Sequence, residues 1–337
     1  MGAYLGRRVA AMPLLLLGVI TLSFLIFRTL PANPLVSIVG ERQLGNEEVV
    51  AAAEERWGLD KSVPEQYVIY LAKVVQGDLG TSFRTRSSVA SDLGARAPAT
   101  FELVLGALAI GVTGGVGLGV LAARRKDRAT DHVSRLFALV GSSLPAFWVG
   151  LVLLFVLYAQ LGWFPGPGRL DPRSVAPPGV TGLYTVDALL AGDVDTFWQA
   201  LRHLALPAFT LGWGLMGIIS RLVRASMLDE LGADYVRTAR AKGLKERQVL
   251  FGHALRNAWL PTLTIIGFSF AFLLTGAVLT ETIFSWPGIG SYAVESSRSL
   301  DYPAITGVVI LGGLVFLVAN LLTDIAYAVA DPKIRLS

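Results

Sequence analysis

Hydrophobic residues along the chain gather into six long runs, separated by polar and charged segments. The runs are Val9–Phe27, Leu103–Ala123, Leu136–Leu161, Leu204–Ser220, Trp259–Leu279 and Ile305–Leu322. A helix needs about 20 apolar residues to cross the hydrocarbon core of a bilayer, so each run approaches or meets that length. The fourth and sixth runs are short, and we expect them to extend into their flanks. The runs are continuous rather than alternating, which excludes a membrane β-barrel. The pattern predicts an all-α polytopic membrane protein with six transmembrane helices.

The first run has a second interpretation, a cleaved signal peptide. Arg7 and Arg8 precede it, as basic residues precede the apolar core of a signal peptide. The run is longer than a usual signal core, however, and no small-residue cleavage site follows before Pro31. We therefore expect a first span that stays in the protein.

Composition agrees with a membrane protein. Of the 337 residues, 53% are hydrophobic and only 16% are charged, whereas about 25% of the residues of a soluble domain are charged. The chain contains no cysteine, so it has neither a disulfide framework nor a thiolate metal site.

The distribution of basic residues predicts the orientation in the membrane. Short loops rich in Lys and Arg stay on the cytoplasmic side, and the segment Arg124–Arg128 is of this kind. Segments 1–8, 124–135, 221–258 and 330–337 hold more basic than acidic residues, which predicts that both termini are cytoplasmic. The net charge of +4 then reflects this orientation. Nucleic-acid binding is not expected, because the basic residues sit at span ends rather than on one continuous face.

The two long external segments contain helical patterns. Between the first two spans, Glu47–Trp57 and Ser62–Gln76 read as amphipathic helices, with Ser62 as N-cap and Pro64 in the first turn. The loop Gly77–Ser82 follows. This region is either a helical cap over the first span or a surface for an external partner, with Asp78, Thr81 and Ser82 as candidate contacts. In the second external segment, Asp187–Leu201 is expected to form a helix along the membrane interface.

Glycines in the second run indicate close helix packing. Gly111, Gly115 and Gly119 are four residues apart and therefore lie on one helix stripe, and such stripes let another helix approach closely in lipid. We expect the neighbouring helix to belong to this chain; a second membrane subunit is the alternative.

Four residues near span ends are candidates for a translocation pathway or its outer gate: Ser142, Pro145, Glu281 and Trp286. Pro145 removes a backbone hydrogen bond, and Ser142 or Ser143 could satisfy the freed carbonyl. Either this bend lines a pathway, or it is an ordinary helix irregularity. Glu281 is either solvated or paired at its span end, or it faces the outer mouth of a pathway. Trp286 is expected to be an interfacial anchor.

Several kinds of chemistry are missing from the sequence. It has no Gly-x-x-x-x-Gly-Lys-Ser/Thr loop for nucleotide phosphates. None of its three histidines is paired at metal-site spacing. We therefore expect no catalytic residue and no cofactor in this chain, which moves or holds a molecule and takes its energy from a partner or an ion gradient.

The polar segment between the fourth and fifth runs is patterned as two short helices. Asp234 can cap the first helix, and Gly243 can end it in the left-handed conformation. Arg237, Arg240 and Lys242 make this helix basic. A second helix is expected at Lys245–Asn257. On these residues alone, lipid contact and partner docking are equally good interpretations.

The same segment resembles the coupling loop of binding-protein-dependent ABC importer permeases. Of the general Glu-Ala-Ala-x-x-x-Gly pattern only Ala239 and Gly243 match, but the segment is similar to the variant found in the dipeptide/oligopeptide/nickel permease subfamily. Stretches along the whole chain agree with that subfamily: Gly77–Ser82, Arg96–Leu103, Ser143–Gly150, Tyr235–Leu244, Glu281–Gly290 and Asp331–Arg335.

This resemblance implies a type I importer permease core with an external scoop segment, in the plasma membrane of a prokaryote. Residues 1–98 would form the first span and the external segment, and residues 99–337 the permease core with a coupling loop at 226–258. The implied partners are a second permease, two ATPases that hold ATP and Mg, an external substrate-binding protein that Asp78, Thr81 and Ser82 would contact, and membrane lipid. The implied coupling residues are Tyr235, Arg237, Thr238, Ala239, Arg240, Lys242, Gly243 and Leu244.

The resemblance favours peptides as substrates and leaves nickel chelates, glutathione and oligosaccharides open. Two functions of other classes are weaker alternatives. An ion-driven secondary transporter would need buried charges near mid-membrane, and these spans have almost none. A structural scaffold for a membrane complex is the other alternative.

Overall fold

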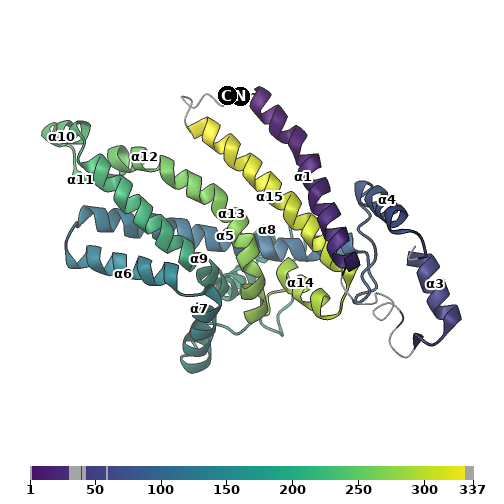
Figure 1. Ribbon diagram of the computed structural model, residues 1–337. Coiled ribbons are helices and arrows are strands. Elements are labelled where there is room, and N and C mark those ends of the chain that lie inside the picture. Colours follow the sequence, from purple (N-terminus) through teal and green to yellow (C-terminus); the bar gives the residue numbers. More distant parts are fainter. Residues whose placement is uncertain (1, 30–38, 40–42, 58–59, 331–337) are drawn as a thin grey trace. The chain divides into compact units, whose positions relative to one another are not determined.

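The computed structural model describes residues 2–29, 39, 43–57 and 60–330 (Figure 1). Regular structure in these residues is helical, and the only strand-like pairing in them is an isolated bridge between Thr81 and Ser88. The all-α prediction is confirmed. The motif Asp331–Arg335 lies outside the described residues. The chain divides into two compact units: Met1–Pro98 with Gly288–Val318 form unit 1, and Ala99–Pro287 with Ala319–Ser337 form unit 2.

All six apolar runs fall on helices. Four helices in the described chain are long and apolar enough to cross a membrane: Gly6–Ile26, Val89–Arg124, Val194–Leu231 and Tyr302–Thr323. Two bent pairs raise the number to six if each is one span: Ala129–Ser143 with Ala146–Gln160, bent by 108°, and Pro261–Phe270 with Phe272–Ile283, bent by 49°. The fourth and sixth runs extend into their flanks as expected.

Unit 1 carries the helices that the sequence predicts to be external. It contains α1 (Gly2–Thr29), α3 (Glu47–Trp57), α4 (Val63–Val75), α14 (Ile289–Arg298) and the first parts of α5 (Val89–Arg124) and α15 (Tyr302–Ala330). α3 has the predicted bounds. Ser62 precedes α4, and its backbone N–H and its hydroxyl both donate to the carboxylate of Glu65, at 3.0 and 2.7 Å. The predicted start of this helix is therefore confirmed, with Pro64 in the first turn.

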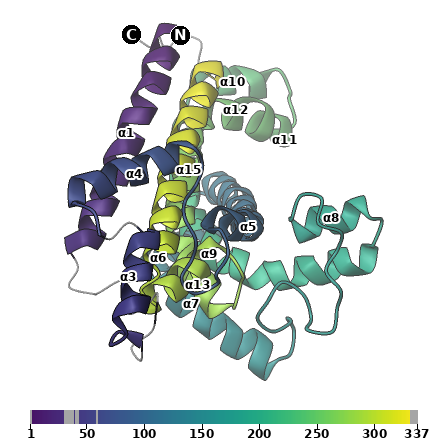
Figure 2. The same cartoon turned by 90° about the vertical axis from the view of Figure 1, so that its right-hand side faces the viewer.

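Two neighbours hold α1 in unit 1. Figure 2 shows α4 lying across α1. The hydroxyls of Thr21 and Tyr67 share a hydrogen bond of 2.7 Å, and the ring of Phe24 packs on that of Tyr70 with centroids 5.9 Å apart. The second neighbour is α15, which passes close to α1 at Gly313. A Cβ atom added to Gly313 would lie 3.5 Å from the Val19 side chain, which is ordinary van der Waals contact.

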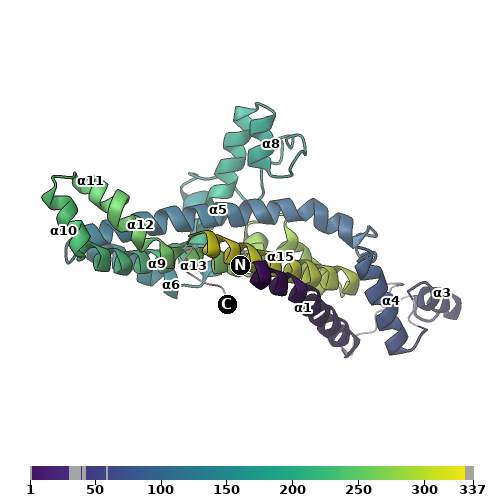
Figure 3. The same cartoon turned by 90° about the horizontal axis from the view of Figure 1, so that it is seen from above.

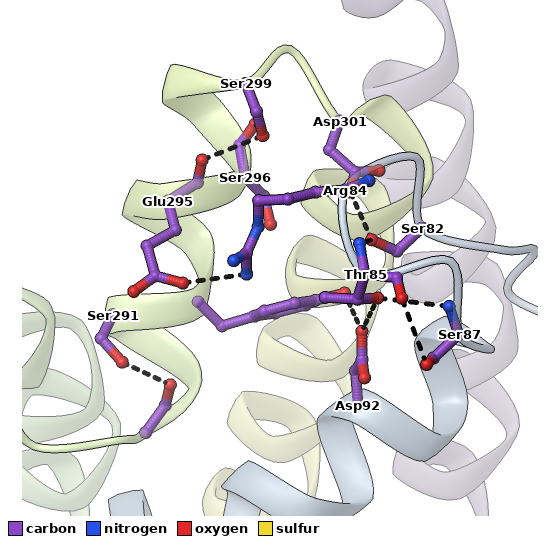
Figure 4. A network of polar contacts seen from close by, with 12 residues as sticks. Ser82, Arg84, Thr85, Ser87, Asp92, Ser291, Glu295, Ser296, Ser299 and Asp301 are labelled. Carbon is purple, nitrogen blue, oxygen red and sulfur yellow. Dashed lines mark hydrogen bonds and ion pairs between the residues drawn. The ribbon is translucent and has the colours of Figure 1, made fainter. Parts of the chain in front are cut away.

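A buried carboxylate, Asp301, fastens the loop at residues 77–88 to the turn between α14 and α15 (Figure 4). Its side chain has no exposed surface. One oxygen accepts from the Ser82 hydroxyl at 2.5 Å and from the Arg84 backbone N–H at 3.1 Å, and the other accepts from the Ala304 backbone N–H at 3.4 Å. Asp301 thus caps the start of α15 and at the same time orders a loop more than 200 positions earlier in the sequence.

A second set of contacts supports the same loop. Asp92 accepts from the hydroxyls of Thr85, at 2.6 Å, and Tyr292, at 3.0 Å. Arg84 pairs with Glu295 at 2.9 Å. Burial, followed by the bond to Asp92, raises the pKa of Tyr292 to about 12. Tyr292 therefore keeps its proton at neutral pH and acts as a hydrogen-bond donor.

In unit 2, the neighbours of α9 (Val194–Leu231) include four other helices. These are α6 (Ala129–Ser143), α7 (Ala146–Leu153), α8 (Tyr184–Leu190) and α13 (Leu260–Ile283). The buried core includes Leu103, Leu211, Leu215, Ile219 and Val223.

Glycines let α5 and α9 approach until their backbones touch. A Cβ atom at Gly111, Gly115 or Gly119 would come within 2.9, 2.8 or 2.7 Å of the side chain of Leu215, Ile219 or Val223. From the other helix, a Cβ atom at Gly212 would clash with the carbonyl oxygen of Ala107. The expectation that this stripe packs within the chain is confirmed.

The second external segment differs from its prediction. Instead of one helix at Asp187–Leu201, α8 ends at Leu190 and α9 begins at Val194 (Figure 3). Gly192 lies between them with φ +72°, a conformation that breaks a helix. Asp193 then starts α9 by accepting from the Thr196 backbone N–H at 3.0 Å. The continuous periodicity concealed this break.

We predict that Gly115→Ala destabilises unit 2. Its new methyl group would lie 2.8 Å from Ile219 and 2.9 Å from the Met216 carbonyl oxygen, and overpacking of this kind costs about 1–3 kcal/mol. Gly117→Ala, on the same helix but with nothing within 4 Å, is the matched control. Heat-induced loss of the detergent-solubilised protein, followed by fluorescence-detected size exclusion, should show a lower midpoint for Gly115→Ala only. Equal midpoints for both variants would contradict this packing.

We also predict that Asp301→Asn loosens the loop at residues 77–88. The amide can accept on one side only, so either Ser82 and Arg84 or Ala304 would face an NH₂ group; losing hydrogen bonds to a charged acceptor costs about 1.5–3 kcal/mol. Hydrogen exchange of the Arg84 amide should accelerate. Asp60→Asn, at an exposed position, should leave it unchanged. Unaltered protection in Asp301→Asn would show that this carboxylate does not order the loop.

Candidate functional site

The polar segment after α9 forms a compact helical hairpin, which Figure 1 shows beyond the end of α9. α10 spans Asp234–Ala241. Gly243 follows with φ +77°, its N–H donates to the Arg240 carbonyl at 2.9 Å, and the Leu244 N–H donates to the Ala239 carbonyl at 3.3 Å. This is the Schellman motif, in which glycine ends a helix. The predicted role of Gly243 in ending the helix is confirmed.

The start of α10 differs from its prediction. Ala233 holds the N-cap position and contributes no side-chain bond, and Asp234 is the first helical residue. Asp234 therefore acts through its charge at the positive end of the helix, and its carboxylate pairs with Arg237 at 3.3 Å. The sequence pattern could not separate these positions, because aspartate is favourable at both.

α10 presents one face to the protein and another to its surroundings. Val236 and Ala239 are buried, at 0% and 6% exposure, against Val249 and Leu231. Ala239, one of the candidate coupling residues, therefore belongs to the apolar cluster that supports α10, and its side chain cannot contact a partner. The other candidates are exposed: Tyr235, Arg237, Thr238, Arg240, Lys242, Gly243 and Leu244.

An ion pair closes the hairpin. Arg240 donates to both carboxylate oxygens of Glu246 in α11 (Glu246–Gln248), at 2.9 and 3.2 Å. The bonds to Glu246 raise the pKa of Arg240, and the bonds to Arg240 lower the pKa of Glu246. Both groups are more than a third exposed, so solvent screens the pair and its effect is mainly to orient the two helices.

Tyr235 is linked to both flanks of the hairpin. Its hydroxyl donates to Glu230 near the end of α9 and accepts from the side-chain amide of Asn257 at 3.1 Å. Burial and the neighbouring Glu230 raise the pKa of Tyr235. This arrangement could not be predicted from the sequence, because the three residues are polar and spread over 28 positions.

The second predicted helix, Lys245–Asn257, is helical but not uniform. It consists of α11, a π-helical segment η3 (Val249–Ala254) and α12 (Leu255–Ala258). Val249, Leu250 and Ala254 face the protein interior. α12 leads directly to α13, so the hairpin is joined to α9 at one end and to α13 at the other.

The bend at Pro145 divides the third apolar run. Leu144 is extended with ψ 135° because proline disfavours the helical conformation of the residue before it. Ser142 donates to the Leu139 carbonyl at 3.1 Å rather than to a carbonyl freed by Pro145, and both Ser142 and Pro145 are exposed. α6 and α7 meet here at 108°.

Glu281 and Trp286 lie in a buried polar cluster of unit 2. Glu281 has no exposed surface and accepts from the Thr100 hydroxyl at 2.6 Å. Trp286 is 1% exposed, and its indole N–H donates to the Ala99 carbonyl at 2.7 Å. The expectation that Trp286 is an interfacial anchor was wrong, because the indole finds its hydrogen-bond partner inside the protein.

The same region contains an ion pair that the sequence did not identify. Glu102 and Arg169 are nearly buried and 2.5 Å apart. Glu102 also accepts from the backbone N–H and the hydroxyl of Thr185, both at 2.8 Å, and Arg169 stacks on Tyr184 with its guanidinium carbon 3.5 Å from the ring centroid. The one sequence feature that could have indicated this pair is Glu102, an isolated charge directly before the second apolar run. The pair fastens the second external segment to α5.

The three candidate contacts of the external loop differ in exposure. Asp78 is exposed and accepts from the Gly80 N–H at 2.8 Å. Thr81 is half-buried in the bridge to Ser88. Ser82 is 1% exposed and donates to Asp301. The Ser82 side chain therefore supports the loop, and of the three candidates Asp78 is open to a partner and Thr81 is partly so.

Comparison with known proteins identifies the family. Residues 115–336 match the binding-protein-dependent transport system inner membrane component, and residues 1–104 match the N-terminal part of such membrane components. Together the matches cover both the hairpin and the external helices.

Curated relatives are similar along the whole chain. The probable D,D-dipeptide transport system permease protein DdpB of Escherichia coli (strain K12) is 40% identical over 98% of this chain and 96% of its own length. The di/tripeptide transport system permease protein DppB of Pseudomonas aeruginosa (strain UCBPP-PA14) is 41% identical over 99% and 98%. The oligopeptide transport system permease protein AppB of Bacillus subtilis (strain 168) is 37% identical over 99% and 100%.

These matches also bear on localisation and chemistry. The matched family is one of inner membrane components, and the chain has several helices long enough to cross a membrane. Both findings indicate a multi-pass inner membrane protein. In the described residues, no group of three or more His, Cys, Asp and Glu side chains is placed to hold a metal ion. The chain belongs to the family of inner membrane components of binding-protein-dependent transport systems, and it is a non-catalytic ABC permease subunit.

Proposed function

We propose that this chain is one of two membrane subunits of an ATP-driven importer of short peptides. The observation that carries this proposal is the end-to-end similarity to relatives whose names specify dipeptides, di- and tripeptides or oligopeptides. A second, related permease would complete the pathway, two ATPases would bind ATP and Mg, and an external binding protein would deliver the peptide.

The exposed face of α10 would dock on an ATPase. Arg237, Thr238 and Lys242 project from a helix whose opposite side, at Val236 and Ala239, is packed against the protein. A helix that is displaced by a partner moves the rest of the protein only if it is packed rigidly against it. The apolar cluster beneath α10 and the Arg240–Glu246 pair provide that packing. With this role, α10 and both termini would lie on the cytoplasmic side, which is what the excess of basic residues in those segments predicts.

The opposite side of the membrane would receive the binding protein. The loop at residues 77–88 is fixed by Asp301 and Asp92 and presents Asp78 and Thr81 outward, which suits a rigid docking surface. Glu281 and Trp286, buried in unit 2 with Thr100 and Ala99, would belong to a closed outer end of the pathway. The bend at Ser142 and Pro145 would line the pathway beside it.

Reconstitution tests the proposal directly. The chain, its partner permease, the two ATPases and the binding protein are placed in vesicles, and uptake of a labelled dipeptide is measured with and without ATP. We expect ATP-dependent uptake that unlabelled di- and tripeptides suppress. Suppression by a nickel chelate, glutathione or an oligosaccharide but not by peptides would contradict the peptide assignment. Uptake that needs a proton gradient but no ATP would contradict the proposal as a whole.

The coupling role of α10 makes a separate prediction. Gly243→Val should leave the chain in the membrane but abolish most ATP-driven uptake, because a β-branched residue at φ +77° is strained by about 1–2 kcal/mol and unwinds the end of α10. Gly252→Val is the matched control, since Gly252 also has open space around it but lies in a helix with ordinary φ. Normal uptake by Gly243→Val, at normal membrane levels, would refute the coupling role of this turn.

A further inference from the structure

Three polar side chains from three helices meet beneath the start of α10. Glu230 is the second-last residue of α9, Tyr235 is the second residue of α10, and Asn257 lies in α12, three residues before α13 begins. The Tyr235 hydroxyl donates to Glu230 and accepts from the Asn257 amide at 3.1 Å, and that amide also lies 3.5 Å from the Glu230 carboxylate. One hydroxyl therefore connects α10 to the end of α9 and to α12, which leads into α13.

We propose that Tyr235 is a positioning residue that joins α10 to both α9 and α13, so that a displacement of α10 moves the two helices together. This inference rests on the proposed function, because it gives the coupling hairpin a means of passing its motion to the membrane. It adds a role for Tyr235 that differs from contact with a partner.

The chemistry of the three groups suits this role. A tyrosine hydroxyl can donate and accept at the same time, Glu230 supplies an acceptor and the Asn257 amide supplies donors. A phenylalanine would fill the same space and make neither bond. A hydrogen bond from a hydroxyl to a carboxylate is charge-assisted and stronger than a bond between neutral groups.

Burial alone does not account for Tyr235. Its side chain is 37% exposed, whereas the neighbouring Val236 is fully buried. The apolar support beneath α10, formed by Val236, Ala239 and Val249 with Leu231, touches the end of α9 but includes no residue of α12 or α13. That support reaches α12 only through Val249 of η3, which continues into α12. The Asn257 amide adds a direct side-chain contact between α12 and Tyr235.

The test compares Tyr235→Phe, Asn257→Leu and the double variant in the complete reconstituted complex. The measured quantity is the number of peptides taken up per ATP hydrolysed. A purely structural defect reduces the amount of intact complex, so it lowers uptake and hydrolysis in proportion and leaves this ratio unchanged. We expect each single variant to lower the ratio by about 2- to 10-fold, the change that one lost hydrogen bond brings to an equilibrium.

The double variant distinguishes a shared connection from two separate contacts. If Tyr235 and Asn257 act through one bond, the double variant is no worse than the more severe single variant. Effects that multiply, or an unchanged ratio in Tyr235→Phe, would overturn the proposal. Tyr158→Phe is the control: Tyr158 is 42% exposed, and no hydrogen bond to its hydroxyl is found in the described residues.

A distance measurement tests the connection independently of transport. The chain has no cysteine, so spin labels on Ala241→Cys in α10 and Arg256→Cys in α12 report on this hairpin once the partner subunits lack cysteines. We expect a narrow distance distribution that broadens in Tyr235→Phe and not in Tyr158→Phe. An unchanged distribution would overturn the proposal. If the unaltered complex takes up no peptide with ATP, the proposed function fails, and this measurement still decides whether Tyr235 holds the hairpin.

Discussion

The close approach of α5 and α9 is the constraint on which unit 2 depends. Gly111, Gly115 and Gly119 remove side chains from one helix, and Gly212 removes one from the other, so that the backbones touch. In a bilayer, where apolar burial contributes little to helix association, contacts of this kind hold helices together. α9 then packs against α6, α7, α8 and α13 and continues without a break to the base of the α10 hairpin. The helix at the centre of the packing is therefore also the helix that the hairpin can move.

Buried charges occur at the connections between segments that are far apart in sequence. Glu102 with Arg169 fastens the second external segment to α5, and Asp301 fastens the loop at residues 77–88 to the start of α15. Each charged group has several hydrogen-bond partners, as buried charges require. Removing Glu102 or Arg169 would leave the other charge buried and uncompensated, which is strongly destabilising. These contacts fix where the two segments attach, and they hold long loops in one conformation.

The sequence predicted what depends on local physics. Runs of apolar residues placed all six candidate spans, Ser62 and Glu65 marked the start of α4, and Gly243 marked the end of α10. It failed where a distant contact decides the outcome. Trp286 looks like an interfacial anchor until Ala99 supplies a partner for its indole, and Ala239 looks like a contact residue until Val249 covers it. The link through Tyr235 was missed for the same reason, because periodicity reports which face of a helix is apolar and not what covers it. The break at Gly192 is local, a glycine with φ +72°, and the continuous periodicity on both sides concealed it.

Transport by this chain depends, in our proposal, on contact between the outward face of α10 and an ATPase. A photo-crosslinking residue placed at Lys242, on that exposed face, tests it most directly in the intact, transporting complex. We expect the main product to join this chain to an ATPase subunit, and the same probe at the exposed residue Asp78 to give no such product. A probe at Lys242 that couples only to lipid, in a complex that still imports peptide, would show that α10 does not dock on the ATPase.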